Sequence, residues 1–272
     1  MSADYAIPHR DRHAFTTYPK FRKFLDESYS AWKDGNGPQY IAAELIKPQV
    51  IASLDKNWRD LPEMRLHYNK SNEKLIVKFA SKRHDLVVTE FREMFLEHCR
   101  SVGITRSDIK SIGTGRDEGT GRSKEPDDCF KPRNTRSGGD DKATLVVEAG
   151  LSETMNQLRS DAHHWLTKTN GEVHIVVLIH IRYDQRILEL ERWERQPNPR
   201  PVHGQNTHRP TCMQSLTLAM QPDGTPTLTG APLVLPINLI FDVLPAHVPT
   251  TGLTFSVQEL EFFVSEYFSI SQ

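Results

Sequence analysis

The sequence has little of what marks several large classes of protein. Its three cysteines are far apart, so neither a disulfide framework nor a cysteine zinc site is indicated. No apolar run approaches the length of a membrane span, and the N-terminus lacks the basic start and apolar block of a secretory signal. We therefore expect a soluble intracellular protein, cytoplasmic or nuclear, that has reduced thiols and no membrane partner.

An excess of charge of either sign is also missing. The chain has 34 Lys and Arg against 35 Asp and Glu, a formal net charge of −1. The overall basic balance of a typical nucleic-acid binder is therefore absent. A near-neutral chain can still carry a local basic groove. The glycines within 114–122 do not match the spacing of a phosphate-binding P-loop, and the 12 histidines show no metal-binding spacing.

Apolar periodicity divides the 272 residues into three parts that we expect to form one compact unit. The first, 1–64, is expected to hold an arm and helices, including an amphipathic helix over 21–33 that packs on the core. The second, 65–195, is the expected core. The third, 196–272, is an extension of short strands that ends in an amphipathic helix over 257–270.

The order of elements in the core indicates its fold class. A hairpin over 65–78 precedes a helix over 82–101, three strands follow, and then come a helix over 151–166 and an apolar strand over 173–181. Ser152 is the expected N-cap of that second helix. Because helices and strands mix within one unit, the sequence predicts an α/β (α+β) fold with a mixed central sheet flanked by helices.

Acidic residues lie on two of the three predicted core strands. Glu125 and Asp127 share one face of their strand, because side chains alternate, and Glu148 is the only charge in the apolar run 144–150. A buried acid requires a metal, a cation or a proton as its partner. Such acids suit Mg²⁺ or Mn²⁺. Three structural roles are the alternatives: Glu125 could be an exposed edge acid, Asp127 or Asp128 could cap the turn, and Glu148 could pair with Arg159.

These residues resemble a known family. The sequence Glu-Pro-Asp at 125–127 followed by Glu-Ala-Gly at 148–150, in this order of elements, resembles the PD-(D/E)XK or restriction-endonuclease-like superfamily. The stretches 145–153 and 159–166 are similar to those of uncharacterised fungal members. The resemblance implies a metal-dependent nuclease of restriction-endonuclease-like fold that acts on nucleic acid. It makes Asp127 and Glu148 the ligands of Mg²⁺ or Mn²⁺, and Glu125, Asp127 and Glu148 the catalytic residues.

The chain departs from that pattern at one position. The superfamily's lysine, two residues after the second acid, falls on Gly150, and glycine can neither position nor activate a nucleophile. Lys124, Lys131 or Arg159 could take its place, and Glu90 could add a fourth acid. Whether the chain is an enzyme therefore stays open between a metal-dependent nuclease, a nuclease-fold binding module that has lost cleavage, and the same fold used for a small-molecule reaction. The oligomeric state is not indicated.

Overall fold

The computed structural model describes residues 7–79, 81–113, 117–119, 122–151, 154–198 and 208–270. The chain divides into two compact units: unit 1 is Met1–Lys82 with Arg116–Glu125, and unit 2 is Arg83–Gly115 with Pro126–Gln272. These boundaries differ from the expected ones at 64 and 195. The reason is strand pairing, since the hairpin over 65–78 joins the sheet of unit 1 and the strands after 196 extend the sheet of unit 2.

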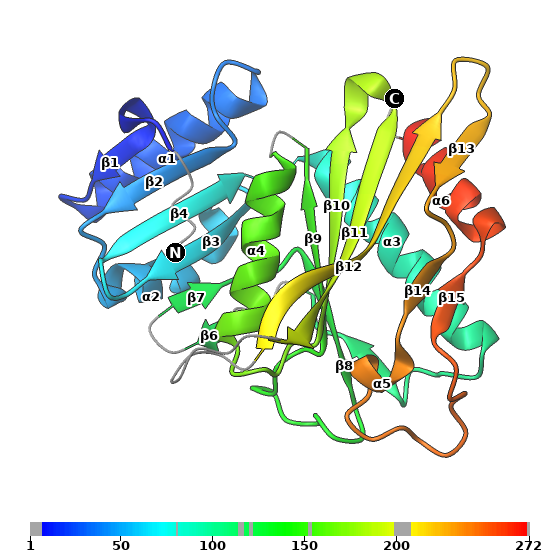
Figure 1. Ribbon diagram of the computed structural model, residues 1–272. Coiled ribbons are helices and arrows are strands. Elements are labelled where there is room, and N and C mark those ends of the chain that lie inside the picture. Colours follow the sequence, from blue (N-terminus) through cyan, green and yellow to red (C-terminus); the bar gives the residue numbers. More distant parts are fainter. Residues whose placement is uncertain are drawn as a thin grey trace. The chain divides into compact units, whose positions relative to one another are not determined.

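Unit 1 contains a six-stranded sheet in the order β1-β2-β4-β3-β7-β6 (Figure 1). Its helices and strands are η1 (His9–Asp11), β1 (Arg12–Ala14), α1 (Tyr18–Lys33), β2 (Tyr40–Glu44), α2 (Pro48–Lys56), η2 (Trp58–Asp60), β3 (Met64–Asn69), β4 (Lys74–Phe79), β6 (Asp117–Gly119) and β7 (Arg122–Lys124). The expectation of an arm and helices over 1–64 is wrong for 40–44, because these residues form β2, which pairs with β4 and is buried. The hairpin β3–β4 is confirmed.

The core of unit 1 lies between α1, α2 and this sheet. Phe21 and Leu25 of α1 are fully buried and belong to the same apolar cluster as Leu75 and Val77 of β4. This agrees with the interpretation of the aromatic stripe on α1 as a packing face, because residues three and four apart lie on one side of a helix.

Unit 2 is built on a seven-stranded sheet in the order β13-β12-β11-β10-β9-β8-β5. Its main elements are α3 (Lys82–Ser101), β5 (Ile109–Ser111), β8 (Asp128–Pro132), β9 (Leu145–Gly150), α4 (Met155–Lys168), β10 (Ile175–Arg182), η3 (Tyr183–Gln185), β11 (Ile187–Pro197), β12 (His208–Met220) and β13 (Pro226–Thr229). The chain then forms β14 (Leu233–Leu235), α5 (Ile237–Ile240), β15 (Leu253–Phe255) and α6 (Val257–Ile270). Only the pair β9–β10 is parallel, so the sheet is mixed.

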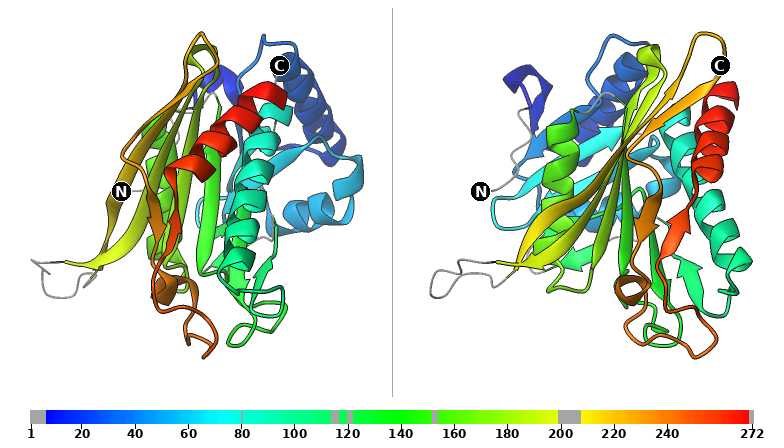
Figure 2. Two further views of the ribbon diagram at one scale, coloured as in Figure 1. Left: turned by 90° about the vertical axis from the view of Figure 1, so that its right-hand side faces the viewer. Right: turned by 45° about the vertical axis from the view of Figure 1, so that its right-hand side comes forward.

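Helices cover both faces of this sheet (Figures 1 and 2). On one face α3 and α6 lie side by side, with the rings of Phe91 and Phe263 6.2 Å apart. On the other face α4 packs through Trp165 against a cluster that includes Val146 and Val176. The β-branched run of β10 is buried on both faces, as expected for a central strand. The α/β (α+β) class, with a mixed sheet between helices, is therefore confirmed.

The start of α4 differs from the expected one. Thr154 is the N-cap, and it forms a capping box with Gln157, in which each side chain bonds to the other residue's backbone N–H. The expected N-cap, Ser152, lies outside the described residues. Among the helices that the structure describes, none combines the length and the apolar content needed to cross a bilayer.

Candidate functional site

Asp127 lies directly before β8 and is 2% exposed. Its Oδ2 accepts a hydrogen bond of 2.8 Å from the backbone N–H of Ala149 in β9. The same oxygen is 3.0 Å from Nε2 of His84, which is fully buried in the first turns of α3. The acid therefore joins the start of α3 to the middle of the sheet.

His84 connects Asp127 to further oxygens. Its Nε2 is also 3.1 Å from the carbonyl oxygen of Ala149, and its Nδ1 is 3.1 Å from Oδ1 of Asp85. Sequence analysis did not identify this histidine. Val87 and Val88, three and four residues further on, place it on the buried face of α3, but only the packing of α3 on β9 shows its partners.

Glu148 is the single acid within β9, and it is 1% exposed. It lies on the α4 face of the sheet, where its Oε1 accepts a hydrogen bond of 2.5 Å from Nε1 of Trp165. The alternative partner considered from the sequence, Arg159, instead binds Glu191 of β11, with 2.5 Å between Nη2 and Oε1. A buried indole N–H requires an acceptor, so Trp165 and Glu148 satisfy one another.

Asp128 is a further buried acid, and it is the first residue of β8. It lies opposite Val147 in the β8–β9 register. Its Oδ2 is 2.6 Å from Nε of Arg92, and its Oδ1 accepts a hydrogen bond of 3.1 Å from the hydroxyl of Ser111. This short contact to a guanidinium makes Asp128 a link between α3, β5 and β8.

Glu125, the third expected catalytic residue, belongs to unit 1. Its Oε2 accepts a hydrogen bond of 3.1 Å from the backbone N–H of Leu66, and its own N–H donates to the carbonyl of Leu66 at 3.2 Å. Glu125 thus extends the pairing of β7 with β3. Of the three acids expected to be catalytic, Asp127 and Glu148 are therefore held in unit 2, both next to Ala149, and Glu125 is held in unit 1.

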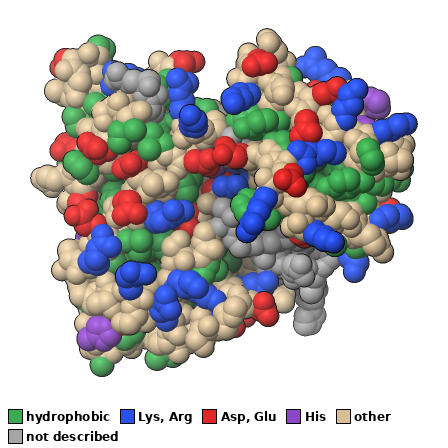
Figure 3. All heavy atoms as spheres, turned by 180° about the vertical axis from the view of Figure 1, so that it is seen from behind, with side chains coloured by type: hydrophobic (Ala, Val, Ile, Leu, Met, Phe, Trp, Pro, Cys, Tyr) green, Lys and Arg blue, Asp and Glu red, His purple; other side chains and the backbone are tan. Residues whose placement is uncertain are grey.

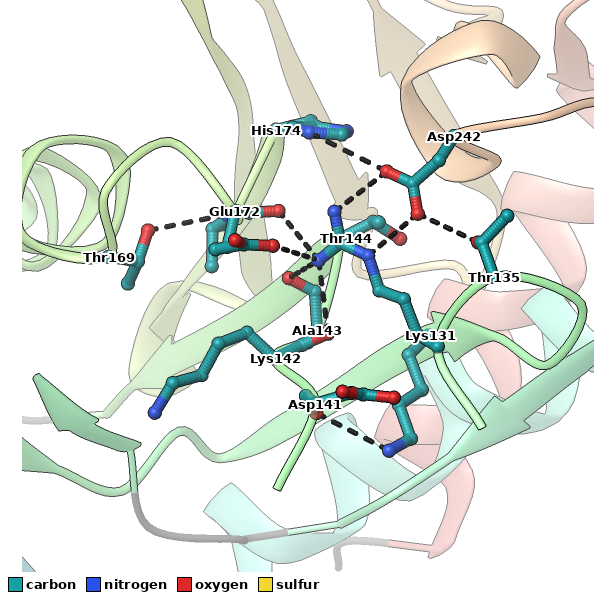
Figure 4. Close-up of polar contacts among 12 residues, drawn as sticks. Lys131, Thr135, Asp141, Lys142, Ala143, Thr144, Thr169, Glu172, His174 and Asp242 are labelled. Carbon is teal, nitrogen blue, oxygen red and sulfur yellow. Dashed lines mark hydrogen bonds and ion pairs between the residues drawn. The ribbon is translucent and has the colours of Figure 1, made fainter. Parts of the chain in front are cut away.

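The residues considered as replacements for the missing lysine have other roles. Gly150 ends β9 opposite His180 of β10. Lys131 is buried, and its ammonium donates to the carbonyl oxygens of Gly138 at 2.5 Å and Asp141 at 3.3 Å (Figure 4). Lys124 is buried within unit 1. Lys131 therefore organises the loop after β8.

Two further acids, Glu90 and Asp161, lie on helices but are not fully exposed to solvent. Glu90 on α3 is half-buried, and burial, followed by the charges of Glu266 and Glu93, raises the pKa of its carboxyl group. Asp161 on α4 is 2% exposed. The sequence does not show whether an acid beside the apolar stripe of a helix is exposed or buried, because that depends on how much of the helix its neighbours cover.

The donor groups around Asp127 and Glu148 decide whether a metal ion could be held there. Among the described residues, no three His, Cys, Asp or Glu side chains are grouped so that they could hold a metal ion. Asp127 and Glu148 accept hydrogen bonds from Ala149 and Trp165, which use oxygens that a cation would require. The described donor set thus does not fit a protein-held Mg²⁺ or Mn²⁺, and this ion stays a prediction from the resemblance.

A second polar cluster fastens the C-terminal part of unit 2 to the β8–β9 connection. Arg136 places Nε and Nη2 2.7 Å from the two oxygens of Asp242, and its Nη1 donates to the carbonyl oxygens of Lys142, Ala143 and Glu172. Figure 4 shows Asp242 between His174 and Thr135. Arg136 is 7% exposed, so this fork is a buried structural clamp.

The chain is only weakly similar to known proteins. The chain matches no model of a known protein family, and no curated protein matches it. Among solved structures it is similar to a protein from Anabaena variabilis described as a candidate nuclease of the DUF820 family. That match has 11% identity and a TM-score of 0.40, and it covers 77% of this chain and 97% of the other. A likeness this weak assigns neither a family nor an activity.

Proposed function

We propose that this chain is a nuclease-like binding module whose buried acids maintain the fold and do not hydrolyse phosphodiester bonds. The proposal rests on the burial and hydrogen bonding of the two acids that the resemblance implies as metal ligands. Asp127 and Glu148 are 2% and 1% exposed, and each accepts a hydrogen bond from a donor within unit 2. Gly150 stands where the nucleophile-activating lysine is expected.

A metal ion and a protein N–H compete for the same lone pairs of a carboxylate. Mg²⁺ requires oxygen ligands in near-ideal octahedral geometry and usually keeps several waters. A carboxylate that is closed off from solvent and already accepts a protein N–H offers little room for that shell. The same hydrogen bonds make each acid costly to remove, which is the behaviour of a structural residue.

A metal-dependent phosphodiesterase is the second candidate, and one observation favours it. Asp127 and Glu148 both lie next to Ala149. Asp127 accepts a hydrogen bond from the backbone N–H of Ala149, and Glu148 directly precedes Ala149 in the chain. His84 adds a nitrogen 3.0 Å from Asp127. Mg²⁺ is often held by one or two carboxylates together with substrate phosphates, so a bound nucleic acid would have to complete such a site.

The test is cleavage of single- and double-stranded DNA and RNA by the full chain in Mg²⁺ and in Mn²⁺. We compare wild type with Glu148→Gln and Asp127→Asn, which keep the shape of each side chain. The expected result is no cleavage above the buffer blank in any of the three proteins. Cleavage by wild type that both variants lose would refute the proposal in favour of the phosphodiesterase.

Binding of the metal itself gives a second readout. Isothermal titration of wild type with Mn²⁺ is expected to show no site that the two variants abolish. A site that binds one Mn²⁺ per chain in wild type and is lost in Glu148→Gln would contradict the structural role, even if no substrate is cleaved.

A further inference from the structure

Unit 2 has a cavity of about 410 Å³ that is separate from Asp127 and Glu148. It is formed by the C-terminal half of α3, the turn at 104–106, the edge strand β5, and Arg133 directly after β8. This volume lies within the range of about 300–1,000 Å³ that is usual for small-molecule sites.

The charge of the cavity wall differs from that of the chain. Arg100, Arg106, Lys110 and Arg133 line it, against a single acid, Glu93. The full sequence has a net charge of −1, so this positive charge is a local concentration. Figure 3 shows the molecule from behind, and Lys and Arg side chains gather at the lower left of that face.

These four cations have no acidic partner in the part of the chain that the structure describes. A second acid near the cavity, Asp108, binds other groups. Asp108 is buried, and its Oδ2 accepts hydrogen bonds of 2.8 Å from both the N–H and the hydroxyl of Thr105. Its Oδ1 is 3.1 Å from Nε2 of His247.

The same contacts hold the wall in place. Burial alone would raise the pKa of Asp108, but the hydrogen bonds from Thr105 and His247 lower it overall, so the residue stays an acceptor at neutral pH. The N–H of Arg133 donates to the carbonyl oxygen of Asp108 at 2.8 Å, and that of Ile104 to Cys99 at 2.8 Å. The turn that carries Arg106 and the strand that carries Lys110 are therefore fixed before any ligand arrives.

The base of the cavity is apolar and uncharged. Cys99, Ile104 and Ile109 line it, and each is at most 4% exposed. Burial raises the pKa of the Cys99 thiol to about 12, so the sulfur carries no negative charge at neutral pH. The cavity thus presents a cationic rim above an apolar base.

We propose that this cavity is a binding site for an organic phosphate. Arginine presents a planar fork that matches phosphate oxygens, and an excess of several cations favours a doubly charged phosphate over a single carboxylate. The apolar base suits a ring or another uncharged group attached to the phosphate. Such a ligand is either a free mononucleotide or the phosphorylated end of a nucleic acid. The site goes beyond the proposed function, because it does not depend on whether Asp127 and Glu148 have a catalytic role.

Titrations of the full chain distinguish the two sources. The probes are inorganic phosphate and adenosine monophosphate by calorimetry, and a fluorescent ten-nucleotide single-stranded DNA, with and without a 5′-phosphate, by anisotropy. Adenosine monophosphate is expected to bind more tightly than phosphate because of the apolar base. A preference for the 5′-phosphorylated DNA over the mononucleotide would identify a nucleic-acid end as the ligand.

The variant pair is Arg106→Ala with Lys110→Ala, and its matched control is Lys168→Ala with Arg209→Ala, two exposed cations of unit 2 outside the cavity. Loss of each cavity cation is expected to weaken binding about tenfold, the size of one hydrogen bond to a charged group. The control pair is expected to leave it within about twofold. Equal losses in both pairs, or no binding of any probe by wild type, would overturn the proposal, whereas the cleavage assay would be unaffected.

Discussion

Replacing Glu148 by alanine separates a structural acid from a catalytic one. Residues that hold a metal or a substrate are often unfavourable for stability, and their removal commonly stabilises the protein. Glu148 is expected to behave in the opposite way. It is 1% exposed in the middle of the sheet, and it accepts the hydrogen bond of Trp165, itself 2% exposed.

The magnitude follows from the groups that lose their partners. A hydrogen bond to a charged acceptor contributes about 1.5–3 kcal/mol, and here the buried indole N–H would be left without this acceptor. The void left by the side chain adds on the order of 1 kcal/mol. Removal of the carboxylate also removes the free-energy cost of burying it, which offsets part of this loss in stability. We expect a net loss of about 2–3 kcal/mol in the free energy of unfolding, which lowers Tm by roughly 5–10 °C for a chain of this size.

The assay is urea unfolding followed by tryptophan fluorescence. Trp165 and Trp193 report on unit 2, and a Trp32→Phe, Trp58→Phe background removes the signal of unit 1. Glu148→Gln keeps an acceptor oxygen and is expected to lose only about 1 kcal/mol. Glu97→Ala, at an exposed acid on α3, is the control and is expected to change stability by less than about 0.5 kcal/mol.

A gain in stability for Glu148→Ala would refute this reasoning. Unchanged stability would do the same, because it would mean that the contact between Glu148 and Trp165 contributes nothing in solution. Either outcome would favour the role that the resemblance implies for Glu148, that of a metal ligand and catalytic residue.

Two further predictions follow from the environment of other buried groups. Arg136→Ala is expected to destabilise the fold by about 3 kcal/mol, because it leaves Asp242 without its guanidinium. The hydrogen bond from that guanidinium lowers the pKa of Asp242, and its effect outweighs that of burial, which raises it. The difference in unfolding free energy between wild type and variant should therefore be full above about pH 4, and it should shrink as acid protonates the folded carboxylate. Calorimetric melting from pH 2 to 7 measures this, and a difference that grows in acid would contradict it. Among the thiols, Cys212 is exposed while Cys99 and Cys129 are buried, so a thiol-specific disulfide reagent should label one cysteine in the native chain and three in urea. Rapid labelling of more than one native thiol would disprove that burial.

The sequence by itself determined the elements whose apolar pattern is strong. The helix α3 and the hairpin β3–β4 follow from periodicities of 3.6 and 2, and the buried strand β10 follows from its β-branched run. The mixed α/β class also followed, but the order of elements from α3 to β10 followed only in part. Strands β6 and β7 lie between β5 and β8, and they were not predicted because they pair with each other and with β3 in the sheet of unit 1. Strand β2 did not, because its five residues are held as a strand by pairing with β1 and β4, which lie elsewhere along the chain.

The partners of the acids were decided by the tertiary structure alone. The sequence indicated that Glu148 required a partner, since a charge inside an apolar strand is unfavourable without one. It could not identify Trp165 of α4 or, for Asp127, His84 of α3, which lie 17 and 43 residues away along the chain. Local patterns fix which face a residue occupies, whereas the donor that meets it depends on how helices pack across the sheet.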